Sequence, residues 1–67
     1  MNKSMLRSFM VLYGDTNRTL ADFLSITEQS LCNKINGNGT EFRQGEIRRI
    51  SLRYRLSAEQ IEAIFFS

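Results

Sequence analysis

Two short helical patterns lie so close together in this sequence that the chain between them has to turn sharply. Apolar residues at helical spacing run from Leu20 to Leu24 and again from Leu31 to Ile35, and only the six residues SITEQS separate the two runs. Intervals of three and four residues are typical of a helix that buries one side. Two helices joined by so short a turn predict a helix-turn-helix at about residues 17–36, although a purely structural helical corner would have the same pattern.

The rest of the chain follows the same periodicity. Proline is absent, and Gly14 and Gly37 stand where helices are expected to end. The pattern predicts helices at 3–13, 17–25, 28–36 and 44–55, and a fifth that begins at the SAEQ capping-box pattern. The sequence therefore predicts an all-α fold of five short helices that forms a single domain, residues 1–67.

Each expected helix carries an apolar stripe, and together the stripes define the expected core. Thr16, Thr27 and Ser57 are the expected N-caps of the second, third and fifth helices. The stripe residues are Leu6, Phe9, Met10, Tyr13, Leu20, Ala21, Phe23, Leu24, Leu31, Ile35, Ile47, Ile50, Tyr54, Ile61, Ile64 and Phe65.

The chain has no covalent or metal staple to support so small a core. Its 67 residues are close to the lower limit at which an apolar core alone stabilises a fold. Cys32 is the single cysteine and histidine is absent, so an intramolecular disulfide and a zinc site of Cys and His are both excluded. We interpret Cys32 as a small packed hydrophobe in preference to a redox switch. These features predict a cytoplasmic protein without a cofactor, a metal or a membrane segment.

The helix expected at 28–36 has an unusual polar side. Opposite its apolar stripe it carries amide and hydroxyl side chains in place of the usual mixture of Glu and Lys. These side chains are Gln29, Ser30, Asn33 and Asn36, with Glu28 at the N-terminal tip. Groups that both donate and accept hydrogen bonds suit the edges of base pairs in the major groove. The plainer interpretation of each residue alone is an exposed polar surface.

Basic residues are concentrated in the second half of the chain, although the net charge is only +2. Between residues 34 and 55, six Lys and Arg side chains are opposed by two Glu. Such a cluster either covers a solvated helix face or attracts a polyanion. Donors that flank the expected helix pair could contact phosphates, and these are Asn17, Lys34, Asn38, Thr40 and Arg43.

The segment TLADFLSITEQSLCNKINGNGTEFRQGEI resembles the helix-turn-helix of the Cro and repressor family of phages, the XRE-like group. The segments KINGNGTEF, EIRRI and RLSAEQIEAIFF extend the resemblance to most of residues 16–66, and they are similar to small Cro-like regulators of phages and prophages of Gram-positive bacteria. The resemblance implies a λ-repressor-like fold in the cytoplasm of a bacterial host. It also implies sequence-specific binding to a double-stranded DNA operator.

The resemblance further implies roles for individual residues. Glu28, Gln29, Ser30 and Asn33 are expected to read bases. The residues expected at the DNA backbone are Asn17, Thr27, Lys34, Asn36, Asn38, Thr40 and Arg43.

Two positions depart from the family pattern. Ser25 stands where the family has the glycine of the turn, so the turn has to suit a serine or accept a left-handed residue at a cost of about 1 kcal/mol. Arg43 stands where a Thr or Ser would cap the fourth helix before Glu46, which exchanges cap stability for a phosphate contact.

An enzyme is a poor fit, because the acidic residues are scattered and have no histidine or nucleophile as a partner. The expected function is a repressor that occludes a promoter by binding its operator as a homodimer, without a small-molecule ligand. The dimer contact is expected at Ile64, Phe65 and Phe66. The same apolar C-terminus leaves a second hypothesis open, a protein-interaction module that acts as an antirepressor or antitoxin.

Overall fold

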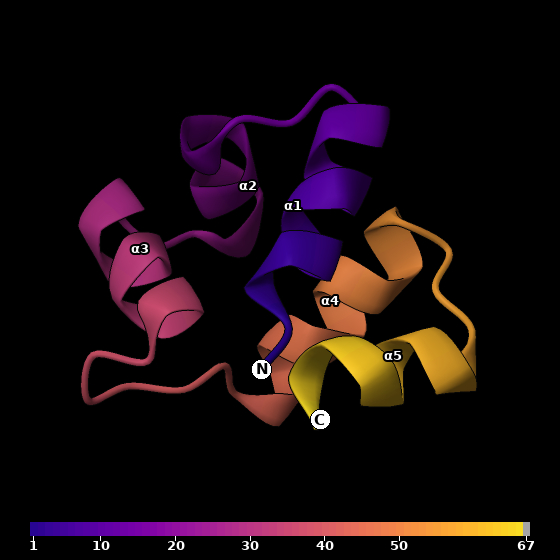
Figure 1. Cartoon of the computed structure of the whole chain (residues 1–67). Helices are drawn as coiled ribbons and strands as arrows, with labels where there is room; N and C mark the ends of the chain where they lie inside the picture. Colours follow the sequence, from indigo (N-terminus) through magenta and orange to yellow (C-terminus); the bar gives the residue numbers. More distant parts are fainter. Residues whose placement is uncertain (67) are drawn as a thin grey trace.

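A computed structural model describes residues 1–66 of the chain, and within them it contains five helices and no strand. The helices are α1 (Lys3–Leu12), α2 (Asn17–Leu24), α3 (Glu28–Asn36), α4 (Gln44–Arg53) and α5 (Ala58–Phe65). Figure 1 shows α3 at one edge of the molecule beside α2, with α4 and α5 toward the opposite side. The predicted all-α fold of five short helices is confirmed.

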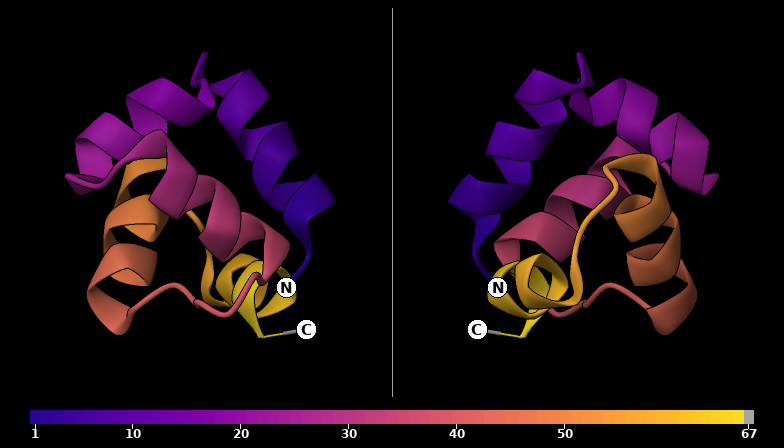
Figure 2. Two further views of the ribbon diagram at one scale, coloured as in Figure 1. Left: turned by 90° about the vertical axis from the view of Figure 1, so that its left-hand side faces the viewer. Right: turned by 90° about the vertical axis from the view of Figure 1, so that its right-hand side faces the viewer.

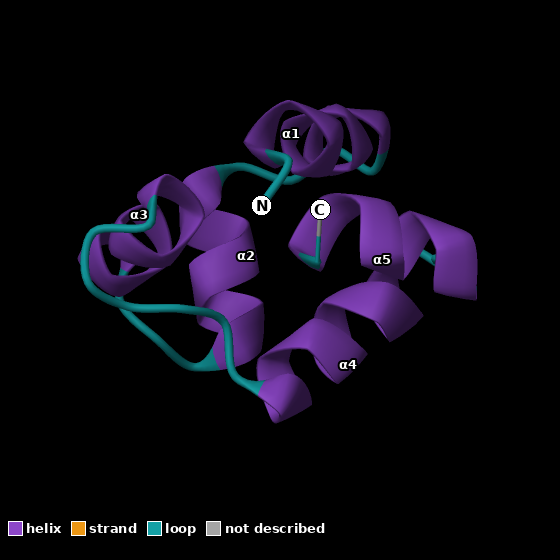
Figure 3. Ribbon diagram, turned by 60° about the horizontal axis from the view of Figure 1, so that its bottom comes forward, coloured by secondary structure: helices purple, strands orange, loops and turns teal. Residues whose placement is uncertain are grey.

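The two ends of the described chain lie next to each other. The N–H of Asn2 donates to the carbonyl oxygen of Ile64 over 2.7 Å, which ties the start of α1 to the end of α5. Figure 3 shows α5 packed between α1 and α4. None of the helices within residues 1–66 is long and apolar enough to cross a lipid bilayer.

The core consists of side chains from all five helices and the residue after α4. Every one of them belongs to a stripe that the sequence predicted. They are Leu6, Met10, Leu20, Ala21, Leu24, Leu31, Ile35, Ile50, Tyr54 and Ile64. Four other predicted stripe residues are half-buried at the margin of this core, namely Phe9, Ile47, Ile61 and Phe65.

Two aromatic residues that were predicted to be buried are exposed, Tyr13 by 45% and Phe23 by 37%. Tyr13 follows the last residue of α1, and its ring lies against the ring of Tyr54 with 5.1 Å between centroids. The Phe23 ring is covered on one side by the guanidinium of Arg53, 4.5 Å from the ring centroid. Both rings therefore cover the edge of the core instead of filling it.

The predicted N-caps are confirmed. The hydroxyls of Thr16, Thr27 and Ser57 each accept a hydrogen bond from the backbone N–H three residues later. The structure has one further cap that was not predicted. The side chain of Asn2 accepts a hydrogen bond from the N–H of Met5 at the start of α1. Side-chain caps replace the hydrogen bonds that the first turn of a helix cannot make internally.

Three predicted helices are one or two residues too long at the C-terminal end. Tyr13 and Ser25 follow α1 and α2 as C-caps, and α4 ends at Arg53. Arg55 has a φ of +51°, a left-handed conformation that stops α4 two residues before the predicted end. The periodicity predicts which residues face the core, but it does not show where the backbone leaves the helix.

Candidate nucleic-acid interface

The turn between α2 and α3 is only three residues long, residues 25–27. Ser25 has φ +60° and ψ +38°, so of the two alternatives that the sequence left open, the turn uses the left-handed one. The N–H of Ile26 donates to the carbonyl oxygen of Ala21 over 3.0 Å, and the Ile26 side chain packs against the core. The turn is therefore held by backbone hydrogen bonds and by one half-buried side chain.

α2 and α3 are the most closely packed pair of helices in the chain. Leu20 and Leu24 of α2 and Leu31 of α3 are buried, and Ala21 is 1% exposed. A side chain as small as alanine allows two helix backbones to approach closely. In the left-hand view of Figure 2, α3 lies nearest the viewer and runs in a different direction from α2. One side of α3 is thus buried and the opposite side lies on the outer surface.

The predicted base-reading residues lie on α3, but they differ in exposure. Glu28 and Gln29 are exposed, whereas Ser30 and Asn33 are half-buried. The structure brings two of them together, because the Gln29 side-chain amide donates to Oδ1 of Asn33 over 3.1 Å. Asn36, predicted at the DNA backbone, is exposed at the end of the same helix.

The start of α2 reaches the middle of α3. Asn17 is the first residue of α2, and its side-chain N–H donates to Sγ of Cys32 over 3.6 Å. Cys32 is half-buried, in line with its interpretation as a packed residue. The first turn of α2, with the exposed Arg18, therefore lies beside α3.

Lys34 does not fit its predicted contact with the DNA backbone. Its ammonium lies 2.9 Å from the carboxylate of Glu46, and both side chains are largely buried, with 12% and 14% of their surface exposed. Burial alone would raise the pKa of Glu46, but hydrogen bonds from the Arg43 N–H and the Lys34 ammonium hold that pKa below its ordinary value. Lys34 therefore joins the end of α3 to the start of α4.

The loop from α3 to α4 is exposed at three of the predicted phosphate-binding positions, Asn38, Thr40 and Arg43. Gly37 has a φ of +70° and follows α3 as the left-handed residue that was predicted. Arg43 is the N-cap of α4 and makes no capping bond with its side chain, so its guanidinium extends into solvent. Thr27 caps α3 with its hydroxyl, which a phosphate contact would have to share.

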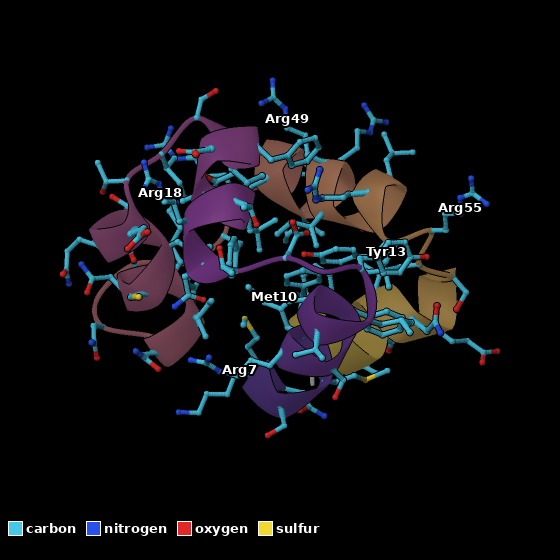
Figure 4. The ribbon with its side chains drawn as sticks, turned by 90° about the horizontal axis from the view of Figure 1, so that it is seen from above. Arg7, Met10, Tyr13, Arg18, Arg49 and Arg55 are labelled. Atoms are coloured by element: carbon cyan, nitrogen blue, oxygen red, sulfur yellow. The ribbon has the colours of Figure 1, made fainter. Side chains whose placement is uncertain are left out.

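The basic residues of the second half do not form one surface. Lys34 and Arg53 pair with acidic side chains of the chain itself. Figure 4 shows Arg55 at the end of the molecule away from α3. Arg18, which belongs to the first half of the chain, is on the side where α3 lies. The local positive charge beside α3 therefore comes from few residues.

A half-buried polar cluster beside α2 was missed by the sequence analysis, which treated Asp15 as an isolated acid. The Asp15 carboxylate accepts two hydrogen bonds from Arg53, both 2.7 Å long, one from Tyr54 and one from Thr19. The bonds from Arg53 in particular hold the pKa of Asp15 well below its usual range. Burial and the neighbouring carboxylate raise the pKa of Tyr54. The cluster fixes the chain just before α2 against the end of α4.

The predicted dimer residues differ in how accessible they are. Ile64 is fully buried in the core, so its side chain is not available to a second copy. Phe65 is half-buried and packs edge-on against Phe42, whereas Phe66 is 67% exposed. Phe66 borders a groove between α4 and α5 that Leu52, Leu56 and Ile61 also line.

Within residues 1–66, no group of three or more His, Cys, Asp or Glu side chains is arranged to hold a metal ion. Comparisons with protein-family models, with curated proteins and with solved structures found no match to this chain. The functional argument therefore depends on the residues and geometry of α2, α3 and the loop that follows them.

Proposed function

We propose that the protein is a sequence-specific DNA-binding transcriptional regulator in which α2 and α3 act as a helix-turn-helix. The observation that carries the proposal is the outer side of α3. There Gln29 and Asn36 expose their amide groups, and the half-buried Asn33 is bonded to Gln29. Leu31 and Ile35 anchor the helix in the core. Amides can pair with the edges of bases, and an α-helix fits the width of the major groove.

The surroundings of α3 supply groups that suit the phosphate backbone on both sides of a groove. On one side is the N-terminal turn of α2, which carries Asn17 and Arg18. On the other side is the exposed loop with Asn38, Thr40 and Arg43. Neutral donors and helix N-termini fix the register of a protein on DNA, and cations supply affinity that depends on salt.

The groove between α4 and α5 supports a homodimer. Leu52 is 74% exposed and Phe66 is 67% exposed, and both line this groove. A second copy that covered the groove would remove both apolar side chains from water. A two-fold dimer then places two copies of α3 about 34 Å apart, one turn of the DNA helix. The dimer blocks polymerase by occupying an operator that overlaps a promoter, as a Cro-like repressor does.

The same groove supports the second hypothesis, a protein-interaction module that acts as an antirepressor or antitoxin. Exposed apolar side chains such as Leu52 and Phe66 suit a different protein as well as a second copy. The two hypotheses differ in what α3 does, because only the regulator uses its amide face.

Selection from a pool of random duplexes separates the two hypotheses. We expect the protein to enrich a sequence with two related half-sites whose centres are about 10 base pairs apart. The variant Gln29→Ala should lose about 1–3 kcal/mol of discrimination at one base pair in each half-site. A selection that enriches no sequence would reject the regulator and favour the interaction module.

A further inference from the structure

Two side chains on the outer side of α3 are joined to each other. Gln29 and Asn33 are one helical turn apart, and Nε2 of Gln29 lies 3.1 Å from Oδ1 of Asn33. Asn33 is half-buried, whereas Gln29 is exposed. The less mobile amide thus holds the more mobile one, since the surroundings of a half-buried side chain restrict its rotation.

The direction of this hydrogen bond decides what Gln29 presents to the outside. A side-chain amide has two N–H donors and one carbonyl acceptor. When one N–H of Gln29 is bound to Asn33, the carbonyl oxygen and the second N–H remain available. An acceptor beside a donor is the pattern that pairs with N6 and N7 of adenine.

The opposite direction would select a different base. If Asn33 donated to the carbonyl oxygen of Gln29, both N–H groups of Gln29 would be free and its oxygen would keep only one lone pair. Guanine presents two acceptors, O6 and N7, in the major groove and would suit that arrangement. The direction of the hydrogen bond between Gln29 and Asn33 therefore decides whether the free groups of Gln29 favour adenine or guanine.

We propose that Asn33 is a positioning residue that orients the Gln29 amide, so that α3 reads adenine through the pair and not through two independent side chains. This inference rests on the proposed function. It names the base at one operator position and the residue that determines the preference without contacting that base.

Three variants test the inference, once selection has supplied an operator and Gln29→Ala has identified the base pair that Gln29 contacts. Asn33→Ala removes the acceptor and leaves the Gln29 amide free to rotate. Asn33→Asp keeps an acceptor and offers no donor, so the Gln29 amide stays in the same orientation. Gln44→Ala is the matched control, because this exposed amide lies at the start of α4 and is not bonded to Gln29.

The readout is the ratio of dissociation constants for guanine and adenine at that base pair, measured by fluorescence anisotropy. A ratio cancels any uniform loss of affinity, including the repulsion between phosphate and the new carboxylate of Asn33→Asp. We expect a preference for adenine of at least about ten-fold in the parent, in Asn33→Asp and in Gln44→Ala. Asn33→Ala should lose most of it. Circular dichroism shows whether each variant is folded.

The possible failures are distinct. A parent that enriches no operator rejects the proposed function and this inference together. An Asn33→Ala variant that keeps the full preference, or a parent that prefers another base at the Gln29 position, overturns the inference and leaves the regulator in place.

Discussion

At the scale of single residues, the Asp15 carboxylate joins the chain before α2 to the end of α4. Its side chain is 3% exposed and accepts hydrogen bonds from Arg53, Tyr54 and Thr19. We expect Asp15→Asn to lower the free energy of unfolding by about 2 kcal/mol, because it removes a covered carboxylate charge and leaves the half-buried Arg53 without its partner. Urea denaturation at pH 7 measures the loss. Asp22→Asn, at an exposed position, is the control and should change stability by less than about 0.5 kcal/mol.

The same carboxylate makes stability depend on pH in the acid range. The pKa of Asp15 is lowered in the folded protein, and in the unfolded chain it is about 3.9. Its contribution is therefore complete above about pH 5 and is lost as the pH falls toward the lower pKa of the folded state. The stability difference between the parent and Asp15→Asn should narrow as the pH falls from about 5 to about 2. A difference that stays constant over this range would show that Asp15 is not the group that titrates.

Left-handed residues show what the sequence predicts at this scale and what it does not. The sequence left open whether Ser25, at the position of the turn glycine, would avoid or adopt a left-handed conformation, and its φ of +60° shows that it adopts one. Arg55, with a φ of +51°, was not predicted, because no glycine or asparagine marks the position. The Asp15 cluster was missed for a related reason, since Asp15 and Arg53 are 38 positions apart and no local pattern connects them.

We expect Ser25→Gly to stabilise the protein by up to about 1 kcal/mol, because glycine removes the left-handed strain. The gain is limited by the extra flexibility of glycine in the unfolded chain. Thermal unfolding measures it, and Ser8→Gly, within α1, is the control that should destabilise. A Ser25→Gly variant no more stable than the parent would mean that the turn stores no strain at this position.

At the scale of elements, helix periodicity predicted the five helices and the buried stripes, but not the contacts between helices. The ion pair of Lys34 with Glu46 joins α3 to α4, and the sequence had placed Lys34 at the DNA backbone. Positions 34 and 46 are 12 residues apart and lie on different helices, so helical spacing could not predict that their opposite charges pair. The outer side of α3 was predictable, because it follows from the positions of Leu31 and Ile35 alone.

Arg43 and Lys34 should therefore behave differently when DNA binding is measured against salt. Arg43→Ala removes a free cation at the start of α4, so affinity should fall alike for all DNA sequences. The salt slope, which is the slope of log affinity against log salt concentration, should flatten by about one unit. Lys34→Ala removes a paired cation, so it should lower thermal stability and leave the salt slope unchanged. Equal changes of slope in the two variants would mean that Lys34 leaves Glu46 to bind phosphate.

At the scale of the whole molecule, exposed apolar residues of α4 and the C-terminus are the basis for self-association. We expect Phe66→Ser and Leu52→Ser to shift the protein toward monomer in sedimentation, and to weaken binding to a two-half-site operator more than to one half-site. Val11→Ser is the matched control, because Val11 is 78% exposed but lies on α1 and does not line the groove. Unchanged sedimentation of both groove variants would place the dimer contact elsewhere.

The most direct test of sequence-specific DNA binding is a fluorescence-anisotropy titration of duplexes from the genomic neighbourhood of this protein, at two salt concentrations and with random competitor DNA. We expect one duplex to form a tight complex that weakens with salt and resists the competitor. The double variant of Gln29→Ala and Asn33→Ala should bind that duplex no better than random DNA. A folded parent protein that itself binds every duplex no better than random DNA would contradict the regulator and favour the interaction module.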